Sequence, residues 1–274
     1  MTDGGSDTGR SRGGERDGAG AIEQRGGLKS SPGPLADRVV AVTGAAGGLG
    51  LKTVRALLDR EALVIANHRS SPGELETLRD KYPDRVWLVP GDIGEERTAE
   101  EIARTARALG RLDALVNNAG IARDQPLATM SVTDWDEVQR VNLRGAFLAT
   151  KHAIRVMMRH RYGRLVYVSS LAAVAGNPGQ AAYAASKAGL HGLSLTVAQE
   201  YAKYGIRSVV LAPGLLDTGL GSELPAATHQ AKADRALLGV GDADSMAATI
   251  AFLTGPDADY INATVIRSDG GLAY

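Results

Sequence analysis

The chain has 274 residues, with 31 lysines and arginines against 31 aspartates and glutamates, and it has no cysteine. The balanced charge argues against a long-range electrostatic nucleic-acid binder. The missing thiols exclude disulfides, thiolate zinc sites and cysteine nucleophiles. No apolar run approaches the roughly 18 residues that a membrane-spanning helix needs, and the N-terminus has no apolar stretch like that of a signal peptide. We expect a soluble, cytoplasmic protein with neither nucleic acid nor a membrane as partner.

Residues 1–36 differ in character from the rest of the chain. They contain repeated Gly-Gly pairs and charges of both signs but almost no large apolar side chains, and the run Ser30–Pro34 (SSPGP) closes the segment. Such a segment buries too little surface to offset the entropy that it loses on ordering. We therefore expect a disordered, Gly-rich tail over residues 1–36, either a plain extension or a docking tail, and one folded domain over residues 37–274.

Short apolar, β-branched runs alternate with helical patterns from residue 37 onward. Such runs are typical of strands buried on both faces of a parallel sheet. The expected strands are Val39–Thr43, Leu63–Ala66, Val86–Val89, Leu112–Val116, Arg164–Val168, Ser208–Ala212 and Thr264–Arg267. Their alternation with helices implies βαβ units with right-handed crossovers. The sequence thus predicts a single-domain, doubly wound α/β fold of the Rossmann type with a seven-stranded parallel sheet.

Two helical stretches between these runs are well marked. One is polar and covers Glu96–Ala108, and the other is one long stretch over about Val132–Arg159. Ser131, with Asp134 three residues later, forms a plausible capping start for the long stretch.

A glycine-rich loop lies directly between the first expected strand and the first expected helix. Glycines let the backbone turn tightly and approach a pyrophosphate, while the helix N-terminus supplies amide donors and a favourable dipole. The alternative is an ordinary Gly-rich turn. The loop predicts a dinucleotide site whose candidate residues are Gly44, Ala45, Ala46, Gly47, Gly48, Leu49 and Gly50.

The residues that follow the second expected strand bear on the choice between NAD and NADP. An acid at this point binds the ribose 2′-hydroxyl of NAD, whereas a cation accommodates the 2′-phosphate of NADP. The run Asn67–Ser71 contains no carboxylate, and the guanidinium of Arg69 can bond a phosphate bidentately. The alternative is that Arg69 is a bystander on a surface loop. We expect NADP(H), held by His68, Arg69 and Ser70.

Tyr183 and Lys187 lie four residues apart, so a helix would place a phenol and an ammonium on one face. Such a pair recurs by chance on many helices, and its weight comes from its neighbours in the sequence. Ser170 ends the fifth expected strand, where ligands bind in open α/β sheets, and Asn142 lies in the long helical stretch.

The order of these motifs resembles the short-chain dehydrogenase/reductase family. The resemblance covers residues 37–274, and its motifs in chain order are the Thr43–Gly50 loop, Asn117–Gly120, Asn142, Ser170, Tyr183 with Lys187, and Pro213-Gly214. Within the family the chain looks most like the branch of 3-oxoacyl-ACP reductases and polyketide ketoreductases. The stretches that carry this likeness are Asn117–Asp124, Asp134–Asp136 leading to Val141–Leu143, and Gly179–Tyr183.

The resemblance implies roles for four catalytic residues. Tyr183 would donate a proton to the carbonyl oxygen that receives charge during hydride transfer. Ser170 would hydrogen-bond that oxygen, and Asn142 would position a water that relays protons to Lys187. Lys187 would hold the nicotinamide ribose, and its ammonium and the oxidised nicotinamide would lower the pKa of Tyr183 from its ordinary value of about 10.

The resemblance also implies further contacts with the cofactor. Two residues that follow the third strand would contact the adenine, and three residues that follow the fourth strand would line the adenosine ribose. Four residues that follow the sixth strand would surround the nicotinamide, which Tyr183 and Lys187 would also contact. These residues are Asp92, Ile93, Asn118, Ala119, Gly120, Pro213, Gly214, Leu216 and Thr218.

Four departures from the family pattern bear on cofactor, substrate and assembly. Gly47 stands where many NADP-dependent relatives carry Arg or Lys, so Arg69 would hold the 2′-phosphate with less help. Glu61 replaces a common glycine. Residues 235–244 lack the usual Pro-Leu-Gly-Arg pattern, and Asn262-Ala263 replaces a common Thr-Gly. The last two leave the substrate and the assembly open.

The leading expectation is an NADPH-dependent ketoreductase that reduces a β-keto thioester or a polyketide ketone. The alternatives are a dehydrogenase of a small secondary alcohol, sugar or steroid and, more remotely, a non-catalytic NADP-sensing protein. An acyl carrier protein is a candidate partner, with Arg161, Arg159 and Lys203 as basic docking residues. Residues 217–236 would form a mobile lid, and the family suggests a homotetramer.

The five histidines show no metal-site spacing, so no metal is expected. His191 lies four residues after Lys187, and we expect it to have a packing role.

Overall fold

The computed structural model describes Met1 and residues 33–222 and 226–272. The chain divides into two units, Met1–Ser31 and Pro32–Tyr274, of which the second is described below. The expected tail over residues 1–36 lies almost wholly outside the described residues. Its last part belongs to the folded unit instead, because Leu35 is buried and its amide donates to the Arg60 carbonyl at 3.0 Å. The tail prediction was therefore a few residues too long.

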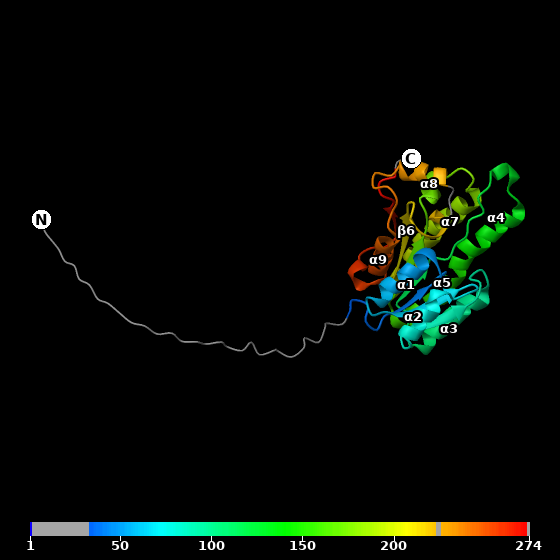
Figure 1. The fold of residues 1–274 in the computed structure, drawn as a ribbon. Coiled ribbons are helices and arrows are strands. Elements are labelled where there is room, and N and C mark those ends of the chain that lie inside the picture. Colours follow the sequence, from blue (N-terminus) through cyan, green and yellow to red (C-terminus); the bar gives the residue numbers. More distant parts are fainter. Residues whose placement is uncertain (2–32, 223–225, 273–274) are drawn as a thin grey trace. The chain divides into compact units, whose positions relative to one another are not determined.

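The folded unit is built on one seven-stranded sheet whose strands all run parallel (Figure 1). The strand order is β3-β2-β1-β4-β5-β6-β7. The strands are β1 (Val39–Val42), β2 (Leu63–His68), β3 (Val86–Pro90), β4 (Ala114–Asn117), β5 (Gly163–Val168), β6 (Ile206–Pro213) and β7 (Thr264–Ser268). The predicted doubly wound α/β fold with a seven-stranded parallel sheet is confirmed.

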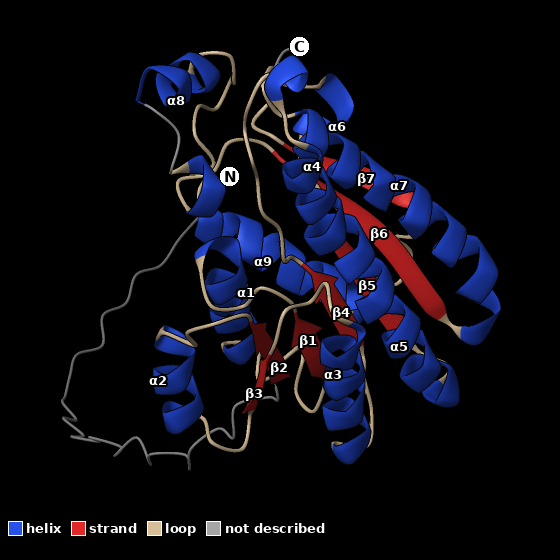
Figure 2. Ribbon diagram, turned by 90° about the vertical axis from the view of Figure 1, so that its right-hand side faces the viewer, coloured by secondary structure: helices blue, strands red, loops and turns tan. Residues whose placement is uncertain are grey.

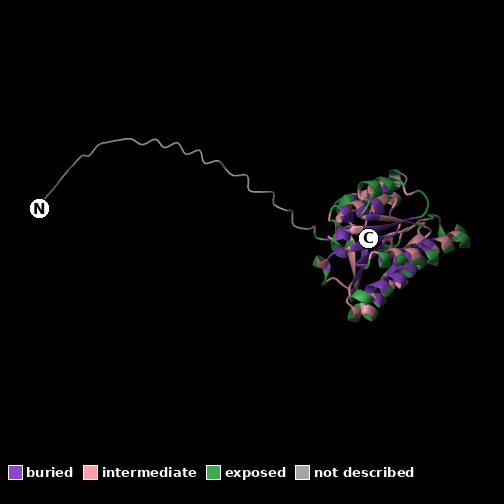
Figure 3. Cartoon of the chain, turned by 90° about the horizontal axis from the view of Figure 1, so that it is seen from below, coloured by how far each residue is buried: buried purple, intermediate pink, exposed green. Residues whose placement is uncertain are grey.

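Helices cover both faces of the sheet and close two hydrophobic layers (Figure 2). One layer joins the sheet to α1 (Gly48–Leu58), α2 (Glu74–Lys81) and α9 (Ala243–Thr254), and the other joins it to α3 (Glu96–Ala108), α5 (Gly145–His160) and α7 (Ala181–Tyr201). Alternate residues of β1 enter opposite layers, as the two-residue period of a strand requires. Val40 packs in the first and Val39 in the second. Both faces of the central strands are therefore buried (Figure 3).

The long helical stretch after β4 extends as expected but contains a π-helical turn. It comprises α4 (Val132–Gln139), the π-turn Arg140–Arg144 and α5. The Ser131 hydroxyl accepts the Asp134 amide at 3.0 Å, so the expected cap is present. Single π-turns inside helices frequently mark functional sites, and this one contains Asn142.

Several shorter elements complete the described part of the chain. They are η1 (Leu127–Thr129), α6 (Ala172–Ala175), η3 (Ala202–Tyr204), η4 (Gly219–Gly221), α8 (Ala226–Ala233) and η5 (Pro256–Ala258). The expected lid, residues 217–236, thus contains η4 and α8 in addition to loop. No helix in the described ranges is long and apolar enough to cross a membrane.

The strand order reverses between β1 and β4, because β2 and β3 lie on one side of this pair and β5, β6 and β7 lie on the other. Crossovers that leave in opposite directions open a crevice beyond the carboxyl ends of the two strands. This is the point at which the fold can accept a ligand.

Candidate active site

A cavity of about 570 Å³ opens at this crevice. Its wall is built from the segments that follow the carboxyl ends of β1, β2, β3, β4, β5 and β6, together with the start of α7. Most of the predicted site residues therefore lie around one cavity, although they are up to 174 positions apart in the sequence, from Gly44 to Thr218.

The glycine-rich loop fits an anionic group at the N-terminus of α1. Gly47 caps this helix without a side-chain bond, and the first turn holds no acidic residue. Among the described residues, no protein acceptor meets the amides of Gly48 and Leu49. Free amides at a helix N-terminus form a ready anion site, which fits a pyrophosphate.

Two other glycines of the loop are needed for close approach. Gly44 has φ of +63°, and an added Cβ would lie 2.8 Å from the Ala119 Cα. A Cβ on Gly50 would overlap the Gly44 carbonyl oxygen. Side chains at these two positions would push the loop away from the segment after β4.

The segment after β4 is fixed to this loop by hydrogen bonds. The Asn118 amide group donates to the Thr43 and Gly44 carbonyls at 3.0 and 3.1 Å. In return, the Thr43 hydroxyl accepts the backbone amides of Asn118 and Ala119 at 3.0 and 3.1 Å. The cavity wall at the predicted adenosine end is thus a hydrogen-bonded junction between the segments that follow β1 and β4.

Arg69 and Asp92 face the same end of the cavity. Arg69 is exposed and forms no ion pair with a described residue. The Arg140 guanidinium, which donates to Asp92 at 2.7 Å, holds the pKa of the Asp92 carboxyl below its usual range, with a smaller contribution from Arg69. The Asp92 carboxylate is therefore ionised at neutral pH.

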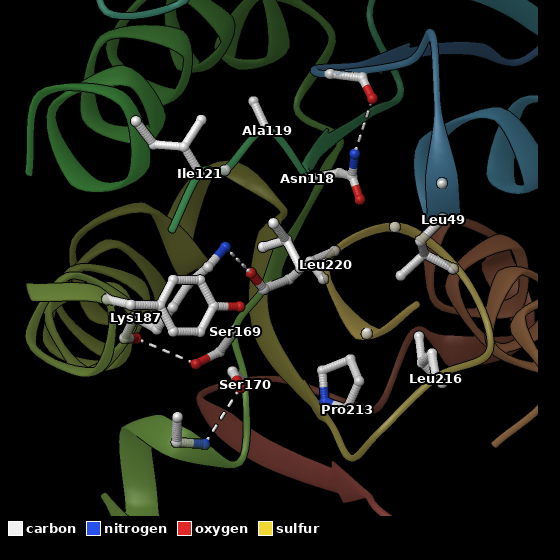
Figure 4. A pocket seen from close by; sticks show the side chains of 18 of the residues that line it. Leu49, Asn118, Ala119, Ile121, Ser169, Ser170, Lys187, Pro213, Leu216 and Leu220 are labelled. Carbon is white, nitrogen blue, oxygen red and sulfur yellow. Dashed lines mark hydrogen bonds between the residues drawn. The ribbon is translucent and has the colours of Figure 1, made fainter. Parts of the chain in front are cut away.

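Ser170, Tyr183 and Lys187 come together at the opposite end of the cavity. Figure 4 shows Ser170 and Lys187 there. Helix α7 begins at Ala181, so Tyr183 and Lys187 lie one turn apart on the helix face that borders the cavity. The Lys187 Nζ lies 5.8 Å from the centre of the Tyr183 ring and donates to the Val168 carbonyl at 2.8 Å. Ser170 follows the end of β5 and shares a hydrogen bond with Tyr183.

Burial dominates the electrostatics of this trio. It raises the pKa of the Tyr183 phenol, which the hydrogen bond with Ser170 lowers in part. Burial also lowers the pKa of Lys187 to about 8. The expected lowering of the Tyr183 pKa by Lys187 does not appear, because desolvation outweighs the other influences on the phenol. Tyr183 therefore holds its proton at neutral pH, as a proton donor must.

Residues 38–229 match the family model described as "short chain dehydrogenase". The chain belongs to the short-chain dehydrogenase family. The match covers the glycine-rich loop, the trio at α7 and the strands between them. The protein is therefore an oxidoreductase of this family, which uses a nicotinamide cofactor.

Individual relatives resemble almost the whole folded unit. The chain is 38% identical to the 3-oxoacyl-[acyl-carrier-protein] reductase FabG of Thermotoga maritima, over 87% of this chain and 98% of that protein. It is 36% identical to the cis-4-hydroxycyclohexanecarboxylate dehydrogenase of Sinomonas cyclohexanicum, over 86% of this chain and 97% of that protein. The crystal structure of a gluconate 5-dehydrogenase from Burkholderia cenocepacia in complex with NADP and tartrate superimposes with a TM-score of 0.81 at 30% identity, covering 87% and 96% of the two chains. The predicted likeness to 3-oxoacyl-ACP reductases is confirmed.

In this short-chain dehydrogenase, Asn142 lies behind the trio rather than on the cavity wall. Its amide oxygen accepts the Ile121 N–H at 2.8 Å, and its amide nitrogen donates to the Ile121 carbonyl and to the Ser186 hydroxyl, both at 2.9 Å. The side chain therefore joins the π-turn to the segment after β4 and to α7. A role of Asn142 in positioning a water stays a prediction.

The segment after β6 closes the end of the cavity at which Ser170 lies. The predicted residues Pro213, Gly214, Leu216 and Thr218 all line the cavity. A Cβ on Gly48 would lie 3.1 Å from the Gly219 Cα, so the first turn of the expected lid rests on the glycine-rich loop.

Five predicted cofactor residues do not line the cavity. Ala45 is buried, with its amide on the Asn67 carbonyl, and Gly50 packs against Gly44. His68 is buried, with its Nδ1 3.0 Å from the Ser70 carbonyl oxygen. The predicted residues outside the lining are Ala45, Ala46, Gly50, His68 and Ser70. Direct contacts from these residues to the cofactor stay predictions.

Several residues of the wall were not anticipated from the sequence. Asn177, Gln180, Arg235 and Leu272 border the cavity on the side of Tyr183 and the lid. Gln180 precedes Tyr183 in a stretch that already stood out, and Arg235 belongs to the expected lid, whereas Leu272 carries no local signal. Unexpected too is a bond of 2.8 Å between His191 Nε2 and the hydroxyl of Ser169, which precedes Ser170.

Glu96, Glu100 and His152 come within 4.8 Å of one another on the surface formed by α3 and α5. The Lys151 ammonium and the His152 ring already bond the Glu96 carboxylate, at 2.7 and 3.0 Å. The Lys151 ammonium would repel a cation at this position, so the cluster of Glu96, Glu100 and His152 is not proposed as a metal site.

Proposed function

We propose that the protein is an NADPH-dependent ketoreductase that reduces a β-keto thioester, of the 3-oxoacyl-ACP kind, or a polyketide ketone to the hydroxy compound. The observation that supports the substrate class most is the 38% identity to a 3-oxoacyl-ACP reductase along 98% of that relative. The trio of Ser170, Tyr183 and Lys187 beside a dinucleotide cradle supports the reaction.

The cofactor, when bound, supplies a hydride to the carbonyl carbon of the substrate. Tyr183 donates its phenolic proton to the carbonyl oxygen as that oxygen gains charge. Ser170 donates a hydrogen bond to the same oxygen and stabilises the charge where it develops. Lys187 provides positive charge one helical turn from Tyr183 and a donor toward the ribose hydroxyls.

The choice of NADPH rests on Arg69. The guanidinium of Arg69 lines the cavity just after the end of β2. The Asn67–Ser71 run contains no carboxylate that could bind the ribose 2′-hydroxyl of NAD. A relative of 30% identity binds NADP. Arginine can bond a phosphate through two parallel donors, so Arg69 is suited to the 2′-phosphate.

Replacing Arg69 by Gln is expected to weaken NADPH binding by roughly 10- to 100-fold, since a charge-assisted bond is lost. NADH, which lacks the 2′-phosphate, should bind nearly as before. Conversely, Gly47→Arg is expected to strengthen NADPH binding by about fivefold. Gly47 is extended, with φ of −155°, and an added Cβ would meet nothing within 4 Å.

Fluorescence titration of both cofactors checks this prediction. Arg79→Gln is the matched control, because Arg79 is an exposed arginine on α2 outside the cavity. Equal losses of NADPH and NADH affinity in Arg69→Gln would contradict a role in recognising the phosphate.

A second candidate is a dehydrogenase that oxidises a small secondary alcohol, including a cyclic hydroxycarboxylate, a sugar or a steroid. The 36% identity to a cis-4-hydroxycyclohexanecarboxylate dehydrogenase favours it. The same residues serve both directions, since the acid of the reduction is the base of the oxidation.

A substrate panel distinguishes these candidates. The purified protein is mixed with NADPH or NADH and with acetoacetyl thioesters or bicyclic ketones, and cofactor absorbance is followed. Separate reactions pair NADP⁺ or NAD⁺ with cis-4-hydroxycyclohexanecarboxylate. Turnover of thioesters with NADPH supports the proposal. Turnover of the hydroxycarboxylate alone replaces it with the second candidate, and tight NADPH binding without any turnover favours a sensing role.

A carrier protein as partner is a further part of this proposal. Arg159, Arg161 and Lys203 are exposed near the ends of α5 and α7, and the Arg161 guanidinium donates to the Lys203 carbonyl at 2.8 Å. Helix α7 starts at the cavity, whereas α5 follows the π-turn that borders it, and the 21 residues of α7 span about 30 Å. Docking on these residues therefore depends on the proposed homotetramer, in which the pocket of a neighbouring copy would receive the substrate.

A further inference from the structure

The adenosine end of the cavity contains an ion-pair cluster that the sequence did not suggest. Its centre is Arg140, in the π-turn, whose guanidinium is bonded by three carboxylates. Nη2 donates to Asp92 Oδ2 at 2.7 Å and to Glu137 Oε1 at 2.9 Å, and Nε donates to Glu137 Oε2 at 2.6 Å. Nη1 lies 3.4 Å from Glu95 Oε1. Of these four residues, only Asp92 borders the cavity.

The guanidinium fits closely against the loop that follows β3. A Cβ on Gly94 would overlap Arg140 Nη1 and lie 2.9 Å from Cζ, so any side chain at this position would displace the guanidinium. The Gly94 amide itself donates to Asp92 Oδ1 at 2.8 Å. Arg144, at the other end of the π-turn, donates to the Gly94 carbonyl. Two arginines of one turn thus hold the loop that contains Asp92.

Each oxygen of the Asp92 carboxylate therefore has one fixed donor, Arg140 or Gly94, and keeps acceptor capacity for a ligand. An ionised carboxylate can only accept hydrogen bonds. The cavity wall at this point suits a ligand edge that carries an N–H donor and opposes one that carries a carbonyl. Among purine rings, adenine presents an exocyclic amine, whereas hypoxanthine presents a carbonyl oxygen at the same position.

We propose that Arg140 is a positioning residue for base recognition, which fixes Asp92 in the orientation that accepts the adenine amine and rejects a keto purine. A half-exposed aspartate that lacked this support would have to be ordered by the ligand, at a cost in affinity. A lysine could not replace the arginine, because a single ammonium cannot hold Asp92 and Glu137 through a planar fork. The inference rests on binding of a dinucleotide and not on the identity of the keto substrate.

The test compares dinucleotides that carry the same phosphates but differ in the purine base, adenine or hypoxanthine. Wild-type protein, Arg140→Gln and Arg140→Lys are titrated with NADPH and with its hypoxanthine analogue, and likewise with NADH and its hypoxanthine analogue. We expect the wild type to prefer adenine by about tenfold, as one charged hydrogen bond would give. Both variants should reduce this preference to about twofold or less. Arg155→Gln, an exposed arginine on α5 outside this cavity, should leave it unchanged.

The ratio of the two affinities separates positioning from other roles. If Arg140 had a purely structural role, its loss would weaken the binding of the adenine and hypoxanthine cofactors equally. If its role were purely electrostatic, Arg140→Lys would keep the preference for adenine. Either result overturns the proposal. Arg140→Lys keeps the charge, so it preserves the test if Arg140→Gln does not fold. If Arg140 acts through Asp92, the double variant Arg140→Lys with Asp92→Asn should match Asp92→Asn alone. A wild type without base preference would also overturn the proposal, whereas failure to reduce a thioester has no bearing on these titrations.

Discussion

Tyr183→Phe is expected to lower the rate of carbonyl reduction about a thousandfold while the affinity for the nicotinamide cofactor changes by less than about twofold. Among the described residues of the cavity wall, Tyr183 is the one phenol that can protonate the new alkoxide, and the substitution removes it. Burial raises the pKa of this phenol, so the proton is present at every pH at which the protein would be assayed. Phenylalanine keeps the aromatic ring and its packing, so the fall in rate measures the contribution of the phenolic proton.

Single-turnover reduction and cofactor titration together check this expectation. Tyr204→Phe is a suitable control, since Tyr204 lies in η3 beyond the far end of α7 and outside the cavity. Retention of more than about a tenth of the wild-type rate in Tyr183→Phe would mean that another group or water supplies the proton. The role given to Ser170 would then need the same re-examination.

The fold could be predicted because each level of the sequence agreed with the next. Short apolar strands, a glycine loop after the first and helical spacing between them all indicate a parallel sheet. Helix α2 was not anticipated, because it buries only Leu75 and the rest of its surface is polar. A helix with so narrow an apolar face leaves little periodic signal.

The site could be predicted where its signal is local and not where it depends on pairing across the fold. Tyr183 and Lys187 lie one helical turn apart, so their spacing alone places them together. Arg140 and Asp92 are 48 positions apart, and nothing in either stretch indicates the other. Arg235 reaches the cavity only through the course of the lid.

The residues around Arg69 show why neighbours in sequence need not share a role. Asn67 and Arg69 line the cavity, whereas His68 between them is buried away from it. Successive side chains at the end of a strand point to opposite sides. The strand expected from the sequence ends at Ala66, whereas β2 continues to His68, so the alternation at His68 and Arg69 could not be predicted.

The second large effect concerns Lys187. Lys187→Met is expected to reduce turnover by at least about a hundredfold, because it removes the positive charge and the donor beside Tyr183. In the wild type, burial lowers the pKa of Lys187 to about 8, so the ammonium present at pH 7 is lost as the pH rises through this value. The kcat/KM for reduction should therefore be level below pH 8 and fall at higher pH, approaching tenfold per pH unit. Measured with respect to the cofactor, this parameter reports the free enzyme.

Lys187→Arg distinguishes the lysine from Tyr183 as the source of the alkaline fall. A guanidinium stays charged over the whole pH range of the assay. Any fall in rate that remains at alkaline pH would then belong to Tyr183, whose pKa is raised above its ordinary value. The variant should therefore be slower than the wild type but keep a level profile to beyond pH 9. A fall at pH 8 in both proteins would assign the limb to another group, and a level wild-type profile would mean that catalysis does not need the Lys187 charge.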